Sequence, residues 1–178
     1  MIRAVLLALL LAGPATATAQ VPEPDAYRGE PYRAPVPATL RGATVVDAGD
    51  AIRLHGENVP FLDVLPRKTR PEGLPEGTIW REPPHETIPG AVWLWDTGWE
   101  NLAPAEQARL ERGLEQVSKG DRAAPMVIFC RSDCWMSWNA ARRAVALGYS
   151  GVHWFPGGIE GWLAAGGAPL VKAVPVGP

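Results

Sequence analysis

Between residues 43 and 169, short apolar segments alternate with segments of helical periodicity. The clearest apolar segment is 126–129, and the clearest helical segment is 135–147, where apolar side chains recur on one helix face. Strands are expected at 44–46, 59–65, 91–93, 126–129 and 152–155. Strands that alternate with helices are typical of a mostly parallel sheet covered on both faces. The sequence therefore predicts a single α/β domain with this architecture.

Residues 1–19 have the three parts of a secretory signal peptide. Arg3 precedes the apolar segment 4–12, and Ala17-Thr18-Ala19 supplies the small residues of a cleavage site. Such a peptide predicts export, into the periplasm of a bacterium, where cysteines can be oxidised. An uncleaved membrane anchor is the alternative, although a membrane span needs about 20 apolar residues. Cleavage would leave no membrane segment.

Proline divides the rest of the chain. Residues 20–42 form a Pro-rich N-terminal arm that we expect to be extended, with Tyr27 and Tyr32 holding it to the domain. The domain itself is expected at 43–170, followed by a C-terminal tail at 171–178. Within the domain, residues 66–90 form a long Pro-rich connection, and connections of this length are commonly functional or disordered.

The only two cysteines of the chain, Cys130 and Cys134, lie between a predicted strand and a predicted helix. Ligands of α/β sheets bind beyond the carboxyl ends of the strands, and a helix N-terminus there favours a thiolate. Cys130 is therefore the better nucleophile, and Cys134 could resolve it. A disulfide between them requires a non-helical loop, because helical Cβ atoms four residues apart lie about 5–6 Å from each other. An inert buried pair is the alternative.

Composition excludes several classes of function. A formal net charge of −2 argues against a nucleic-acid-binding protein, and two cysteines cannot form a four-thiolate zinc site. The three histidines lie at no ligand spacing from the cysteines, so we expect no metal and no cofactor. The cysteine spacing is neither that of covalent haem attachment nor that of a thioredoxin motif.

Other polar residues near the cysteines have two interpretations each. Asp63, at the end of a predicted strand, could orient the cysteine loop or cap the turn that follows. Arg131 could steer an anion toward the loop or be a solvated surface residue. His85 is expected to be a surface histidine, and Arg142 and Arg143 are expected to be solvated because they lie off the apolar stripe of their helix.

Four short motifs resemble the rhodanese family in order and spacing: Phe61-Leu62-Asp63-Val64, Ile88-Pro89-Gly90-Ala91, Cys130-Arg131-Ser132 and Gly157-Gly158-Ile159 with Trp162. The resemblance implies that Cys130 carries sulfur as a persulfide and passes it to a nucleophilic acceptor. It also implies that the loop residues Arg131, Ser132, Asp133 and Trp135 bind the anionic sulfur, chiefly through their amides. The expected partners are a small sulfur-containing substrate and a thiol acceptor.

The loop departs from the family pattern at three positions. Asp133 stands where the family commonly has Gly, and it adds a negative charge beside the anion site. Trp135 stands where an Arg is usual, which removes a donor for thiosulfate-like substrates. Cys134 is a second cysteine that the family pattern of the loop does not contain.

The segment Cys134-Trp135-Met136-Ser137-Trp138 is similar to exported rhodanese-like proteins named for a Cys–Cys–Trp motif. That resemblance implies an association with pyrroloquinoline quinone-dependent alcohol catabolism in the periplasm. Two alternatives to sulfur transfer stay open. One is a thiol–disulfide protein that uses both cysteines. The other is a non-catalytic accessory module for a quinone-dependent dehydrogenase, with the Trp-rich and Pro-rich segments as its binding surface.

Overall fold

The computed structural model describes residues 21–176, and the predicted signal peptide lies outside them. Within these residues, five strands form one sheet in the order β1-β6-β5-β2-β4, and every neighbouring pair is parallel. The strands are β1 Thr44–Val45, β2 Phe61–Asp63, β4 Val92–Trp93, β5 Met126–Phe129 and β6 Val152–Phe155. The helices are α1 Ala48–Gly56, α2 Pro104–Ser118, α3 Trp135–Ala146 and α4 Gly158–Ala164. None of these helices in residues 21–176 is long and apolar enough to span a membrane.

The central strand β5 and its neighbour β6 have the bounds that the sequence predicts. β5 is buried at all four positions, as expected of an apolar strand with neighbours on both sides. Helices α1 and α2 begin where local signals place them. Asp47 accepts a hydrogen bond from the Asp50 amide and so caps α1, while Pro104 occupies the first turn of α2, where its missing N–H costs nothing.

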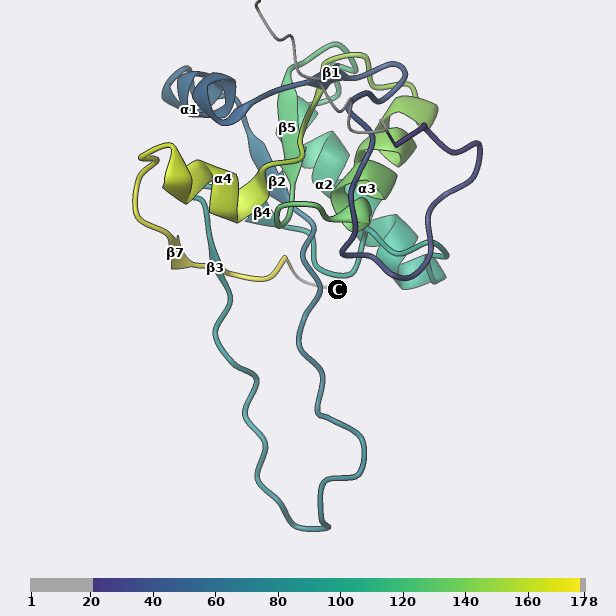
Figure 1. The fold of residues 1–178 in the computed structure, drawn as a ribbon, viewed down its shortest axis with the longest axis vertical. Helices are drawn as coiled ribbons and strands as arrows, with labels where there is room; N and C mark the ends of the chain where they lie inside the picture. Colours follow the sequence, from purple (N-terminus) through teal and green to yellow (C-terminus); the bar gives the residue numbers. More distant parts are fainter. Residues whose placement is uncertain (1–20, 177–178) are drawn as a thin grey trace, which may run out of the picture.

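The helices cover both faces of the sheet, which confirms the predicted architecture (Figure 1). On one face, α2 and α3 bury Leu110, Leu114 and Trp138 against the sheet. On the other, α1 and α4 contribute Leu54 and Trp162 to a second apolar cluster. The carboxyl ends of β2 and β5 lie side by side, since Asp63 is in register with Phe129. The segments that follow β2 and β5 therefore meet at the carboxyl end of the sheet, and the segment after β5 holds both cysteines.

A small antiparallel sheet joins two segments that the sequence does not identify as strands. β3, Glu86–Thr87, pairs with β7, Val171–Lys172. Beyond β7, the Val176 amide donates to the Trp93 carbonyl at 3.3 Å, so the C-terminal segment lies along the outer edge of β4. Each partner strand has only two residues, which is too short for a periodic signal.

The N-terminal arm is extended and lies over α3. The Asn139 side chain forms two hydrogen bonds with the backbone of Arg28, each 2.9 Å long. Arg142 donates to arm carbonyls, and the Arg143 guanidinium lies 3.9 Å from the centroid of the Tyr27 ring. Arg143 is buried, so the expectation that it is solvated is wrong. The arm supplies both the acceptors and the aromatic ring that allow these arginines to be covered.

The long connection between β2 and β3 extends away from the domain and returns to it, without forming helix or strand (Figure 1). An ion pair between Arg67 and Glu82 joins its two halves close to the domain. Beyond that pair the connection is mostly exposed, with Ile79 the most exposed large apolar side chain.

Candidate active site

Cys130 and Cys134 form a disulfide in the loop between β5 and α3. The loop is not helical, and α3 begins only at Trp135, so the condition that the sequence sets for a bridge is met. The Cα atoms of the two cysteines lie 6.6 Å apart, within the usual range for a disulfide. Asp133 has a φ of +50°, in the left-handed region that glycine favours and that Asp tolerates better than most residues.

The disulfide is buried beneath the N-terminal arm. Cys130 is fully buried and Cys134 is 3% exposed. The arm crosses the loop in an isolated antiparallel pairing that sets Arg33 opposite Cys134. The hydrogen bonds of this pairing run from the Ala34 amide to the Asp133 carbonyl (3.1 Å) and from the Trp135 amide to the Tyr32 carbonyl (2.8 Å).

Helix α4 covers the loop from another direction and adds a carboxylate to it. The Ile159 amide donates to the Cys130 carbonyl at 3.1 Å. The Glu160 carboxylate accepts from the Ser132 amide at 2.9 Å and from Arg131 Nε at 2.7 Å. Sequence reasoning did not identify Glu160, because its role depends on how α4 packs against the loop.

The environment of Glu160 keeps its side chain ionised. Partial burial opposes the charge, but the hydrogen bonds from the Ser132 amide and the Arg131 side chain outweigh it, so the pKa of Glu160 lies below its usual value. Glu160 is therefore a resident anion at the loop. Two of the amides that the family resemblance assigns to the anion cradle, those of Ser132 and Trp135, already have protein acceptors.

Asp63 is fully buried at the end of β2, directly beside the strand that leads to Cys130. Its Oδ1 accepts from the Leu65 amide at 2.9 Å, as expected of a residue that caps the following turn. Its Oδ2 accepts from the Thr87 hydroxyl at 2.6 Å and contacts Nε2 of His85 at 2.7 Å. These three partners lie outside the cysteine loop, which favours the turn-capping interpretation of Asp63.

His85 is not the surface histidine that the sequence suggested, since its side chain is only 12% exposed. Its ring lies 4.4 Å, centroid to centroid, from that of Trp93, and Nε2 faces the Asp63 carboxylate. An Asp carboxylate beside Nε2 favours the tautomer with its proton on that nitrogen, which leaves Nδ1 as an acceptor. No signal in the sequence connects His85 with Asp63, because 22 residues of Pro-rich chain separate them.

A cavity of about 350 Å³ lies between the long connection, the cysteine loop and α4. Its lining includes His85 and Trp93, which follow β2 along the chain, and Arg131 and Glu160 from the cysteine loop and α4. Leu65, Ile159, Leu163 and Leu170 add apolar surface to the lining, and the charged residues Lys68, Glu82 and Glu86 also line it. The cavity therefore joins the residues that follow β2 and β5, and a small substrate entering it would reach the rim of the cysteine loop.

Trp135 and Trp138 are packing residues in this structure. Both are buried, and their ring centroids lie 5.5 Å apart in an edge-to-face arrangement. Trp135 contributes its backbone amide to the arm, and its side chain belongs to the core cluster on the α3 face. The structure thus brings together the loop residues Cys130, Arg131, Ser132, Asp133, Cys134 and Trp135, of which Arg131 and Asp133 are exposed. Asp63 lies beside them with its own partners.

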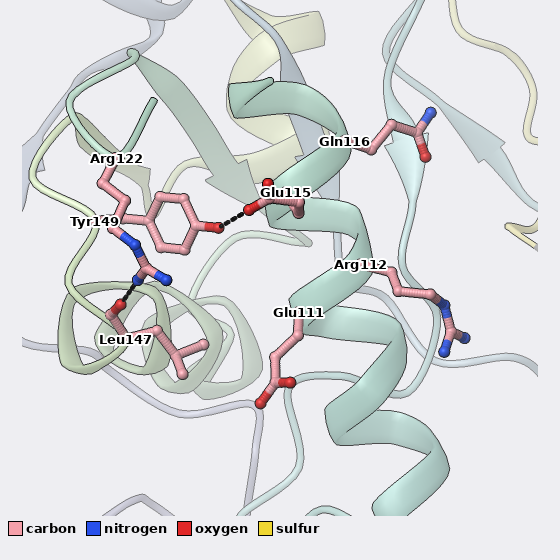
Figure 2. A pocket seen from close by; sticks show the side chains of 7 residues that line it. All are labelled: Glu111, Arg112, Glu115, Gln116, Arg122, Leu147 and Tyr149. Carbon is pink, nitrogen blue, oxygen red and sulfur yellow. Dashed lines mark hydrogen bonds between the residues drawn. The ribbon is translucent and has the colours of Figure 1, made fainter. Parts of the chain in front are cut away.

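A second hollow, of about 610 Å³, lies at the other end of α3 (Figure 2). The Tyr149 hydroxyl donates to the Glu115 carboxylate at 3.4 Å, and Arg122 donates to the Leu147 carbonyl. The hollow is separated from Cys134 by the length of α3, about 18 Å for 12 residues. Because of this separation, the hollow does not contribute to the cysteine site.

Comparison with known proteins agrees with this geometry. The sequence model of the rhodanese-like domain matches residues 51–165. The chain belongs to the rhodanese-like domain family. The match includes β2, the whole cysteine loop and α4. Membership in this family indicates sulfurtransferase-type or related chemistry.

One solved structure, described as an uncharacterized protein from Saccharomyces cerevisiae, is 22% identical to this rhodanese-like chain. The alignment covers 70% of this chain and 93% of that one, with a TM-score of 0.40. No curated protein matches the chain.

Proposed function

We propose that this rhodanese-like protein takes up sulfane sulfur as a persulfide on Cys130 and releases it as hydrogen sulfide through attack by Cys134. The proposal rests on the disulfide between the two cysteines, which lies in the loop that the family resemblance assigns to sulfur transfer. Because Cys134 bonds to Sγ of Cys130, its thiolate is within reach of the atom that it must attack to expel a sulfur carried on Cys130. The disulfide is then the state that follows one turnover.

The first step moves one sulfur atom to Cys130. The Cys130 thiolate attacks the outer sulfur of a persulfide donor, RS–SH, and the donor's S–S bond breaks. The donor leaves as the thiolate RS⁻ with the electron pair of that bond, and Cys130 becomes a persulfide. The position of Cys130 after β5, in a loop that leads into α3, is typical of an activated thiol.

The second step releases the sulfur. The Cys134 thiolate attacks Sγ of Cys130, and the bond between Sγ and the outer sulfur breaks. Hydrogen sulfide leaves as HS⁻ with that electron pair, while Cys130 and Cys134 become a disulfide. A dithiol reductant must then return both cysteines to thiols before another cycle. The burial of both cysteines protects the persulfide from hydrolysis and from unrelated thiols.

Mass spectrometry tests the proposal directly. Reduced Cys134→Ser protein, treated with a low-molecular-weight persulfide, should gain one sulfur atom on Cys130. The unaltered protein should instead lose two hydrogen atoms and form the disulfide. If the Cys134→Ser variant gains no sulfur from persulfide or thiosulfate, Cys130 is not a sulfur carrier.

The disulfide itself favours a second candidate, a thiol–disulfide redox protein. In that case the disulfide would exchange with a dithiol of a partner protein, and no sulfide would be produced. The two candidates differ in one product. Sulfide release from a persulfide donor supports sulfur transfer, whereas dithiol oxidation without sulfide supports the redox alternative.

We also propose that the protein acts in the periplasm, near quinone-dependent alcohol oxidation. The signal-peptide pattern of residues 1–19 and the similarity to Cys–Cys–Trp motif proteins support this proposal. A host that carries Cys130→Ser should then grow more slowly on the relevant alcohols. Unchanged growth would favour an accessory role that needs no cysteine chemistry, and recovery of the protein in the cytoplasm would contradict the location.

A further inference from the structure

The loop around Cys130 holds a carboxylate in a position that an anionic substrate would need. Glu160 accepts from the Ser132 amide at 2.9 Å and from the side chain of Arg131 at 2.7 Å. A guanidinium of the arm, Arg33, lies 3.8 Å from the same carboxylate. An amide and two guanidinium groups are the donors that proteins use to bind oxyanions.

Glu160 is fixed there by the packing of α4. Gly158 has a φ of +53°, and a Cβ on it would lie 2.5 Å from the carbonyl carbon of Arg131 and 2.7 Å from the oxygen of Cys130. The helix therefore begins in direct contact with the loop backbone, and the Ile159 amide donates a hydrogen bond to the Cys130 carbonyl. Because the first turn of α4 cannot move away from the loop without breaking these contacts, neither can the backbone that carries Glu160.

A sulfur oxyanion would meet two obstacles at this loop. The Ser132 amide and Arg131 are already used by Glu160, so the anion would have to displace a carboxylate on the same protein. It would also bring a second negative charge close to Glu160, and like charges at short range repel each other even where solvent partly screens them, as it does at this 37% exposed side chain. The negative charge of Asp133 belongs to the same loop. An organic persulfide presents its outer sulfur without a sulfonate-like head group, so its transfer does not need the Ser132 amide and the Arg131 side chain that Glu160 occupies.

From this arrangement we propose that Glu160 determines the sulfur donor: it excludes sulfur oxyanions such as thiosulfate and leaves organic persulfides as the donors of Cys130. The inference rests on the proposed function and adds its substrate class. With thiosulfate, the Cys130 thiolate would attack the outer sulfur and sulfite would leave with the electron pair. With an organic persulfide, a thiolate leaves instead. Glu160 is a specificity-determining residue and takes no part in either bond change.

The experiment compares two donors across a small set of variants. Sulfur loading of Cys130 is measured with thiosulfate and with an organic persulfide in the Cys134→Ser background, where the loaded sulfur remains bound. Glu160→Gln removes the charge and keeps the shape, whereas Glu160→Asp keeps the charge. Glu111→Gln, an equal charge change on the exposed side of α2, is the matched control.

We expect Glu160→Gln to raise the second-order rate constant for loading from thiosulfate by at least about tenfold, as expected when a like charge is removed from a binding site. Loading from the persulfide should change by less than about threefold. Glu160→Asp and Glu111→Gln should leave the preference between donors as it is. If Glu160→Gln does not improve loading from thiosulfate, the specificity inference is wrong, even where the persulfide loads Cys130 normally.

A binding measurement gives a readout that does not depend on turnover. Sulfate, which transfers no sulfur, is titrated into the oxidised protein while the ¹⁵N–¹H signal of Ser132 is followed by NMR. Glu160→Gln should bind sulfate at least about tenfold more tightly than the unaltered protein. Equal affinity in both would overturn the inference. Failure of any donor to load Cys130, with this sulfate difference intact, would instead count against the proposed function alone.

Discussion

The contact between α4 and the cysteine loop depends on Gly158, so its replacement by Ala is a sharp test of the site. The residue has two separate constraints. Its φ of +53° lies in the left-handed region, and an added Cβ would meet the loop backbone at 2.5–2.8 Å. The atoms that it would meet belong to the backbone of Cys130 and Arg131, which has no free rotamer to move into.

The structure offers a control that separates the two constraints. Gly166 has a φ of +80°, but a Cβ there would have no atom within 4 Å. Gly166→Ala should therefore cost only the left-handed strain, about 1–2 kcal/mol. Gly158→Ala should cost that amount and a further 1–3 kcal/mol or so for overpacking against backbone. The expected total for Gly158→Ala is about 2–5 kcal/mol.

Urea denaturation, followed by tryptophan fluorescence in the oxidised protein, measures both free energies of unfolding. The difference between the two variants isolates the contact between α4 and the loop. Gly158→Ala should also slow sulfur loading of Cys130, whereas Gly166→Ala should not. Equal loss of stability in the two variants would refute the close packing of α4 on the loop, and with it the fixed position of Glu160.

Three further predictions concern the surroundings of the site. Thr87→Val removes a buried hydrogen bond of 2.6 Å to the Asp63 carboxylate, so it should lower the free energy of unfolding by about 2 kcal/mol, and a loss under 0.5 kcal/mol would contradict this network. Ala34→Pro removes the amide hydrogen that Ala34 donates to the Asp133 carbonyl of the loop. A dithiol should therefore reduce the disulfide several-fold faster in this variant than in the control Ala38→Pro, and equal rates would show that the arm does not protect the disulfide. Burial, reinforced by the charge of nearby Arg53, lowers the pKa of His153 in the folded protein. As the pH falls, the unfolded chain therefore binds this proton before the folded protein does, and the free energy of unfolding should decrease below about pH 6.5. Urea denaturation between pH 7.5 and pH 5 should therefore show a weaker pH dependence for His153→Gln, and an unchanged slope would contradict the assignment.

Much of the fold follows from local patterns. The bounds of β5 and β6 are predictable because each is a short apolar segment between turn residues. The start of α1 is predictable because Asp47 is a strong capping residue. β3 and β7 are not, because Glu86–Thr87 carries no apolar run and the two segments pair with each other across more than 80 residues of chain. The burial of Arg143 is hidden for the same reason, since the arm that covers it lies more than 100 residues earlier in the chain.

The candidate site divides in the same way. The position of Cys130 after a buried strand predicts its place at the carboxyl end of the sheet. Cysteine geometry predicts that Cys134 can form a disulfide with it only if the loop between them is not helical. Glu160 and His85 could not be assigned, because each acquires its role through a contact with a segment 22 or more residues away. Only the packing of α4 and of the long connection brings those side chains to the cavity.

The central claim is that Cys134 displaces sulfur from Cys130, and a single-turnover measurement of sulfide tests it most directly. Fully reduced protein, freed of reductant, is mixed with an excess of an organic persulfide under anaerobic conditions, and the sulfide released is measured against the protein present. If Cys134 expels the carried sulfur, the reduced protein should show a burst of one sulfide per protein molecule, matched by formation of the Cys130–Cys134 disulfide, and Cys134→Ser should show no burst. A burst of equal size in Cys134→Ser, or disulfide formation without sulfide, would contradict it.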